Sequence, residues 1–183
     1  MKYGLQMFSV RDVTEQDMEG ALRQVAEMGY ASVEFAGFMG HPAEQIKAWL
    51  DQYGLEVSGT HTGMALLTDE LLEETIAYHK AIGCKNIIVP YEKFATKADI
   101  DAFVDRVKVV EPKLKAAGIQ LPYHNHDHEF QHNRDGLIPA EALLQLTRML
   151  LVVHTHWADA AGWDHAAGLA RPSPRHRVRH RTA

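Results

Sequence analysis

The sequence predicts an α/β fold built on parallel strands, and a repeated pattern carries this prediction. Four times along the chain, an amphipathic helical stretch runs into a glycine and then into a short run of strand-forming residues. The glycines are Gly29, Gly54, Gly83 and Gly118. Each stands where the end of a helix needs a residue that tolerates positive φ. Their separations of 25, 29 and 35 residues suit strand–helix–strand units, whose right-handed crossovers build parallel sheets.

Six strands and five intervening helices are expected in chain order. Apolar residues at helical spacing precede the first two glycines: Leu22, Val25 and Met28 before Gly29, and Ile46, Trp49 and Leu50 before Gly54. The last helix covers 139–146, where Pro139 suits a first helical turn. Strands are expected at 3–10, at 32–35, between Gly54 and His61, at 85–89, between Gly118 and His126, and at 150–154.

Polar side chains at the carboxyl ends of these strands favour a (β/α)8 barrel over an open doubly wound sheet. A barrel gathers residues from many strand ends on one face, whereas a doubly wound sheet concentrates its chemistry at one switch point. Neither a G-x-G-x-x-G after the first strand nor a P-loop sequence occurs, so no nucleotide site is predicted. The strand ends in question are Gln6 to Arg11, Glu34, Thr60 and His61, Tyr91 and Glu92, His124 to His126, and His154 to Trp157.

The predicted barrel is incomplete, with about six βα units. A full barrel typically needs about 250 residues, and this chain has 183. A partial barrel is expected over 1–165, followed by an Arg, Pro and His-rich tail over 166–183 that has no helical or strand period and is predicted to be disordered. Unpaired edge strands of an open sheet favour pairing with another chain, so self-association through these edges is expected.

Charge and composition limit the expected partners. The net charge is −5, but 171–183 holds five arginines and no acid. Without them, 14 basic side chains face 24 acidic ones, which leaves a charge of −10 that disfavours nucleic acid as a partner. The single cysteine, Cys84, fits a reducing compartment, and the start of the chain matches neither a signal peptide nor a membrane span. A cytoplasmic protein without membrane attachment is expected.

The stretch PYHNHDHEF, residues 122–130, is the densest group of candidate functional residues. It holds three imidazoles and two carboxylates in nine residues. Strand alternation sends His124 and His126 to one face and Asn125 to the other. The alternative interpretation is a polar strand end in which histidines only satisfy backbone hydrogen bonds.

Five segments together resemble the sugar phosphate isomerase/epimerase proteins of the xylose isomerase-like barrel superfamily. The resemblance extends from about residue 2 to residue 165. It implies a (β/α)8 barrel, a divalent metal at the carboxyl ends of the strands, and chemistry on a sugar, keto-sugar or cyclitol. The segments are YGLQMFSVRD, MGYASVEFAG, GCKNIIVP, AAGIQLPYHNHDHEF and THWADAAGWD.

The implied reaction removes a proton from a carbon next to a carbonyl. A metal on the carbonyl and hydroxyl oxygens stabilises the enediolate, while carboxylates or imidazoles move the proton. Mixed nitrogen and oxygen ligands suit Zn²⁺, Mn²⁺ or Co²⁺. The resemblance makes Glu34 and His61 proton-transfer or substrate-binding residues. It makes Glu129 a metal ligand with His124 and His126 lining the substrate, and the reverse assignment stays open.

The remaining roles also come from the resemblance. Arg11, Asn125 and Trp157 are expected around the substrate. His154 stands where relatives have a metal-ligating aspartate, and a neutral imidazole there removes one negative charge from the site. The alternative function is a catalytically inactive barrel that binds sugar or associates with itself. A third possibility from the same superfamily, an abasic-site endonuclease, is disfavoured by the charge of −10.

Overall fold

The computed structural model describes residues 3–154, 157, 160–162 and 178–180. The chain divides into two compact units: unit 1 comprises 1–88 and 114–120, and unit 2 comprises 89–113 and 121–183. No helix in the described part of the chain combines the length and apolar character that crossing a membrane requires.

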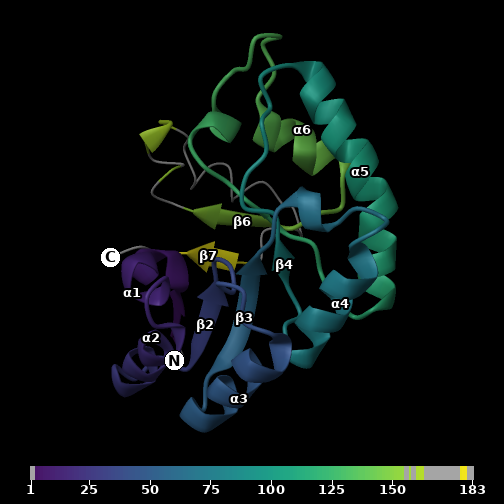
Figure 1. The fold of residues 1–183 in the computed structure, drawn as a ribbon. Coiled ribbons are helices and arrows are strands. Elements are labelled where there is room, and N and C mark those ends of the chain that lie inside the picture. The colour runs from purple at the N-terminus through teal and green to yellow at the C-terminus, as the bar shows by residue number, and fades with distance from the viewer. Residues whose placement is uncertain (1–2, 155–156, 158–159, 163–177, 181–183) are drawn as a thin grey trace. The chain divides into compact units, whose positions relative to one another are not determined.

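Unit 1 is built on a four-stranded parallel sheet whose spatial order follows the chain (Figure 1). The parallel pairing predicted from the glycine-punctuated repeat is therefore confirmed in this unit. The strands are β1 (Gly4–Gln6), β2 (Ser32–Phe35), β3 (Glu56–His61) and β4 (Ile87–Ile88).

The first strand is shorter than the sequence predicts. It was expected to continue to Val10, but β1 ends at Gln6, and a 3-10 helix η1 (Met7–Val10) and the short helix α1 (Arg11–Thr14) follow. The Gln6 side chain accepts a hydrogen bond from the backbone N–H of Phe8, which caps the 3-10 helix and turns the chain out of the sheet. The apolar character of the segment conceals this local turn.

Three helices of unit 1 cover one face of its sheet. They are α2 (Met18–Glu27), α3 (Ala43–Tyr53) and α4 (Leu72–Ala81), and a 3-10 helix η2 (Met64–Leu66) precedes α4. Asp17 caps α2 by accepting a 2.8 Å hydrogen bond from the N–H of Gly20. The buried core joins Leu22, Ile46 and Trp49 of the helices to Val33 and Phe35 of β2.

The four predicted helix-ending glycines all adopt positive φ. The angles are 89° at Gly29, 67° at Gly54, 75° at Gly83 and 80° at Gly118. A side chain with a Cβ is strained in this region, so glycine is the residue these turns require. The predicted chain reversals are confirmed at each position.

Unit 2 holds a three-stranded parallel sheet in the order β5, β6, β7. Helix α6 has the predicted bounds, with Pro139 in its first turn. The rings of Phe94, Phe103 and Tyr123 pack together with centroids 5.4 to 5.7 Å apart. The elements are β5 (Tyr123–His124), η3 (His128–Phe130), α6 (Pro139–Leu146), β6 (Leu151–His154), β7 (Val178–His180) and most of α5 (Lys97–Ala116).

Strand β7 lies inside the tail that the sequence predicts to be disordered. Its three residues pair in parallel with Val152, Val153 and His154 of β6. Most of the tail lies outside the described residues, so the prediction for the tail as a whole stays a prediction.

Candidate functional site

A carboxylate and an imidazole meet at the carboxyl ends of β2 and β3 in unit 1. Glu34 Oε1 lies 3.0 Å from His61 Nε2, and the two side chains are only 5% and 13% exposed. The amide nitrogen of Gln6, at the end of β1, lies 3.3 Å from His61 Nδ1. An amide nitrogen can only donate, so His61 Nδ1 accepts, and Nε2, the nitrogen nearer to Glu34, then carries the ring hydrogen. Three neighbouring strands thus fix the tautomer of one imidazole.

This arrangement can support proton transfer. A carboxylate that is nearly excluded from water and lies beside an imidazole is a common acid–base combination in enzymes. The structure brings together Glu34 and His61, both predicted from the sequence as site residues, and adds Gln6 to them. Their catalytic role stays a prediction.

A second buried histidine, His79 of α4, supports the end of β3. Its Nδ1 donates a 2.6 Å hydrogen bond to the carbonyl oxygen of Thr75, so its Nε2 accepts from the hydroxyl of Thr60, at 2.8 Å. Burial lowers the pKa of His79 and keeps the ring neutral. Sequence reasoning missed this residue, although His79 follows Leu72 and Thr75 at the helical spacing of a buried face.

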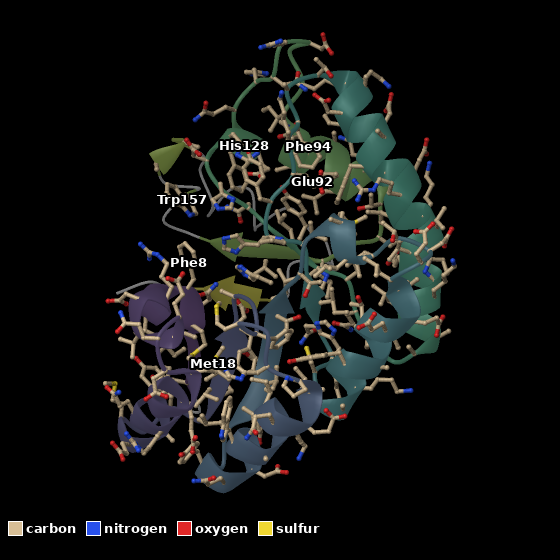
Figure 2. The ribbon with its side chains drawn as sticks, in the orientation of Figure 1. Phe8, Met18, Glu92, Phe94, His128 and Trp157 are labelled. Carbon is tan, nitrogen blue, oxygen red and sulfur yellow. The ribbon has the colours of Figure 1, made fainter. Side chains whose placement is uncertain are left out.

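Arg11, predicted to hold a substrate oxygen, is exposed and contacts its own neighbourhood. Its Nη1 donates a 3.2 Å hydrogen bond to the carbonyl oxygen of Phe8, and its guanidinium lies 4.5 Å from the centre of the Phe8 ring. Phe8 is labelled in Figure 2. The contacts described for Arg11 do not join it to Glu34 or His61, and its substrate role stays a prediction.

In unit 2, two donors hold the fully buried carboxylate of Glu129, and an imidazole nitrogen lies close to it. The hydroxyl of Tyr123 donates to Oε1 at 2.6 Å, and the backbone N–H of His126 donates to Oε2 at 2.7 Å. Nε2 of His128 lies 3.1 Å from Oε1. Burial, followed by the nearby Glu129 carboxylate, raises the pKa of Tyr123 well above its usual value, so its phenol remains a donor.

Aromatic rings surround His126 in the same unit. The ring centres of His124, Tyr91 and Trp157 lie 5.0, 5.7 and 5.7 Å from that of His126. Figure 2 shows His128 and Trp157 in this region, together with Glu92. The carbonyl oxygen of Glu92 lies 3.1 Å from Nε2 of His128. The structure therefore brings together His124, His126 and Trp157, three of the residues predicted to line the substrate.

Two further residues of unit 2 have structural roles that the sequence did not predict. Asn125, predicted to bind substrate, is completely buried, and its amide donates a 3.4 Å hydrogen bond to the carbonyl oxygen of His126. Tyr123 was not singled out, yet its hydroxyl both donates to Glu129 and accepts a 3.0 Å hydrogen bond from the N–H of Glu92. Its position directly before the histidines was the only signal in the sequence.

The described residues do not complete a metal site. Metal ligands need lone pairs directed at a common point, whereas the Glu129 oxygens already accept from Tyr123 and from the N–H of His126. Within the described part of the chain, no three His, Cys, Asp or Glu side chains are placed to hold an ion. The side chain of His154, the other predicted ligand, lies outside the described residues. Metal binding through Glu129 and His154 stays a prediction.

Several solved structures share the fold of this chain. A sugar phosphate isomerase/epimerase from Parabacteroides distasonis matches 98% of it with a TM-score of 0.84 and 21% identity. A D-allulose 3-epimerase from Methylomonas sp. matches 98% with a TM-score of 0.73 and 16% identity. An AP endonuclease of family 2 from Brucella melitensis matches 96% with a TM-score of 0.72 and 16% identity. The chain covers 76%, 71% and 76% of these three structures.

These similarities confirm the predicted fold class. The chain has the α/β architecture of a (β/α)8 barrel, with β1 to β6 as the six predicted strands, and it shares this fold with sugar phosphate isomerase/epimerase structures. Neither a protein-family model nor a curated protein matches the chain. Because an AP endonuclease shares the same fold, the fold alone does not select the reaction.

Proposed function

We propose that this protein is a sugar isomerase or epimerase that moves a proton on the carbon next to a carbonyl. The observation that carries the proposal is the nearly buried pair of Glu34 and His61, 3.0 Å apart at the ends of two parallel strands. The sugar phosphate isomerase/epimerase and the D-allulose 3-epimerase of the same fold support this class of substrate. The charge of −10 outside the last five arginines argues against the endonuclease reaction.

In the proposed reaction Glu34 is the base. Its carboxylate takes the proton from the hydroxyl-bearing carbon, and His61, whose Nε2 lies 3.0 Å from Glu34 Oε1, positions the carboxylate. Gln6 holds His61 in the tautomer that makes this contact. Low exposure of both side chains keeps water away from the carboxylate and strengthens its interaction with a charge developing nearby.

The number of bases bears on the kind of product. A single base that returns the proton to the neighbouring carbon, on the same face of the enediolate, gives isomerisation. Epimerisation requires delivery of the proton to the opposite face and therefore a second acid. The Glu34 and His61 pair alone suits isomerisation. The sequence resemblance implies a metal, but within the described part of the chain no three His, Cys, Asp or Glu side chains are placed to hold one, and the steps above belong to Glu34, His61 and Gln6.

Deuterium exchange tests the proposal. The full chain is incubated in D₂O with D-fructose, D-allulose or L-ribulose, with and without added Mn²⁺ or Zn²⁺, and NMR follows deuterium at the carbons next to the carbonyl. We expect exchange with at least one sugar, and a loss of about 10²- to 10⁴-fold in Glu34→Gln. Glu74→Gln, an exposed carboxylate on α4, is the matched control and should keep the wild-type rate.

Two results would count against the proposal. Exchange that persists at the wild-type rate in Glu34→Gln would remove Glu34 as the base. Absence of exchange with every sugar and metal, in a folded protein that still binds one of the sugars, would favour the non-catalytic alternative. Metal content measured by mass spectrometry on the same samples separates a missing ion from a missing activity.

A further inference from the structure

We infer that a one-residue β-bulge at Ser58 is what brings Glu34 and His61 onto the same face of the sheet. Ser58 and Asn86 are then positioning residues for the proposed proton-transfer pair. The catalytic importance of this alignment rests on the proposed function, whereas the alignment itself follows from the pairing of β2 with β3.

The pairing of β2 with β3 slips by one residue. Ser32 pairs with Glu56 and Val33 with Val57, but Glu34 pairs with Gly59, so Ser58 has no partner in β2. Paired residues of neighbouring strands point to the same face, and alternate residues share a face along each strand. Glu34 therefore shares a face with Gly59 and His61.

Contacts on the opposite face confirm the slip independently. Val57 packs against the core formed with the helices, and Thr60 contacts His79 of helix α4. These two residues are three apart, and regular alternation would place them on opposite faces. One extra residue between them restores both to the helix side.

Without the bulge the pair would not form. Continuing the regular register from Val57 would place Ser58 opposite Glu34, and Glu34 would then share its face with Thr60. His61 would turn toward the helix layer, where Thr60 now lies. The register in which the two strands pair therefore decides which side chain of β3 lies beside Glu34.

Three features hold the bulge in place. The Ser58 hydroxyl donates a 3.0 Å hydrogen bond to the carbonyl oxygen of Val33, and the side-chain amide of Asn86 donates a 2.8 Å hydrogen bond to the carbonyl oxygen of Ser58. The extra residue is thus tied to the strands on both sides. At Gly59 a Cβ would lie 2.7 Å from Cδ1 of Ile88, so a side chain after the bulge would force Ile88 to shift.

NMR of the histidine side chains tests the inference without relying on activity. In the full chain, the ring nitrogens of His61 are assigned by their disappearance in His61→Gln. The measured quantity is the change in their chemical shifts, at fixed pH, when Glu34 is replaced by Gln. This change is compared between the wild-type background and backgrounds in which the bulge is altered, as in a double-mutant cycle.

We expect deletion of Ser58 to keep this response, because Val57 and Gly59 would then pair with Val33 and Glu34 in regular register and His61 would stay on the face of Glu34. Loss of the response in a folded deletion variant would overturn the inference. The double variant Ser58→Ala, Asn86→Ala keeps the extra residue but removes both side-chain hydrogen bonds that hold it. We expect it to lose more than about half of the response, and full retention would overturn the inference. Ser58→Thr keeps the hydroxyl and should keep the response.

Deuterium exchange measured on the same variants separates the two proposals. The shift change of His61 could depend on the bulge as expected while the protein exchanges no sugar proton. This result would support the alignment by the bulge and refute the proposed function. Full exchange activity in variants whose His61 response is lost would instead show that the alignment of the pair is not needed for the reaction, and would refute the positioning role.

Discussion

The hydroxyl of Tyr123 donates a 2.6 Å hydrogen bond to Oε1 of Glu129, and both side chains are buried. A buried carboxylate is costly unless donors surround it. Tyr123 thus stabilises Glu129, whatever further role that carboxylate has.

Replacing Tyr123 with Phe should therefore destabilise the protein. The change leaves a buried carboxylate oxygen with one donor fewer, which costs about 1 to 3 kcal/mol. Urea unfolding measures the loss. Tyr91→Phe is the matched control, because Tyr91 is 56% exposed, and a loss no larger than that of the control would contradict the prediction.

Tyr123 should also make the fold sensitive to alkali. Burial and Glu129 raise the pKa of Tyr123 in the folded state, while an unfolded tyrosine ionises near pH 10. The folded state then holds the proton more tightly, so this contribution to stability is complete below about pH 10 and is lost as the pH rises above it. The free energy of unfolding should fall less steeply above about pH 10 in Tyr123→Phe than in the wild type. Parallel slopes would show that Tyr123 does not cause the dependence.

His79 should make the fold sensitive to acid. Burial lowers its pKa in the folded state, whereas an unfolded histidine titrates near 6.5. Protonation favours the unfolded chain, so stability is complete above about pH 6.5 and declines as the pH falls toward the lowered pKa. In His79→Gln the free energy of unfolding should depend less on pH in this range. His132→Gln, at an exposed position, should leave the slope unchanged.

Gly54 should be intolerant of a side chain. Its φ of 67° ends helix α3, and adding a Cβ in this conformation costs about 1 to 2 kcal/mol. Gly63 is the matched control, because its φ is −67° and a Cβ would meet nothing within 4 Å. Thermal or urea unfolding should show Gly54→Ala destabilised and Gly63→Ala unchanged or slightly stabilised. Equal effects in the two variants would contradict this explanation.

The regular parts of the fold could be predicted from the sequence because they depend on local patterns. Helix α6 and strand β2 have the bounds that periodicity predicts, and the glycines that end the helices follow from backbone sterics. The early end of β1 could not be predicted, because it depends on one side-chain hydrogen bond from the N–H of Phe8 to Gln6.

The candidate site was only partly predictable, for a related reason. Glu34 and His61 were identified as polar strand ends, but Gln6 was included only as part of a longer segment. His79 was missed because it lies on a helix at an apolar position, and the partner that satisfies its ring, Thr60, is 19 residues away. The roles of Gln6 and His79 depend on contacts between segments far apart in the sequence, and local sequence patterns do not predict such contacts.

The register slip at Ser58 lets strand β3 hold one extra residue without reversing the sides on which its last residues lie. Because Ser58 has no partner in β2, its removal would let Gly59 follow Val57 in regular register, with Thr60 and His61 on the sides they occupy now. A comparison of sequences counts such a change as a single short gap. In this protein that gap would leave the histidine beside Glu34, whereas the full set of residues paired without the bulge would place a threonine there. The pairing of the two strands at this point is therefore as informative about the chemistry as the identity of the residues.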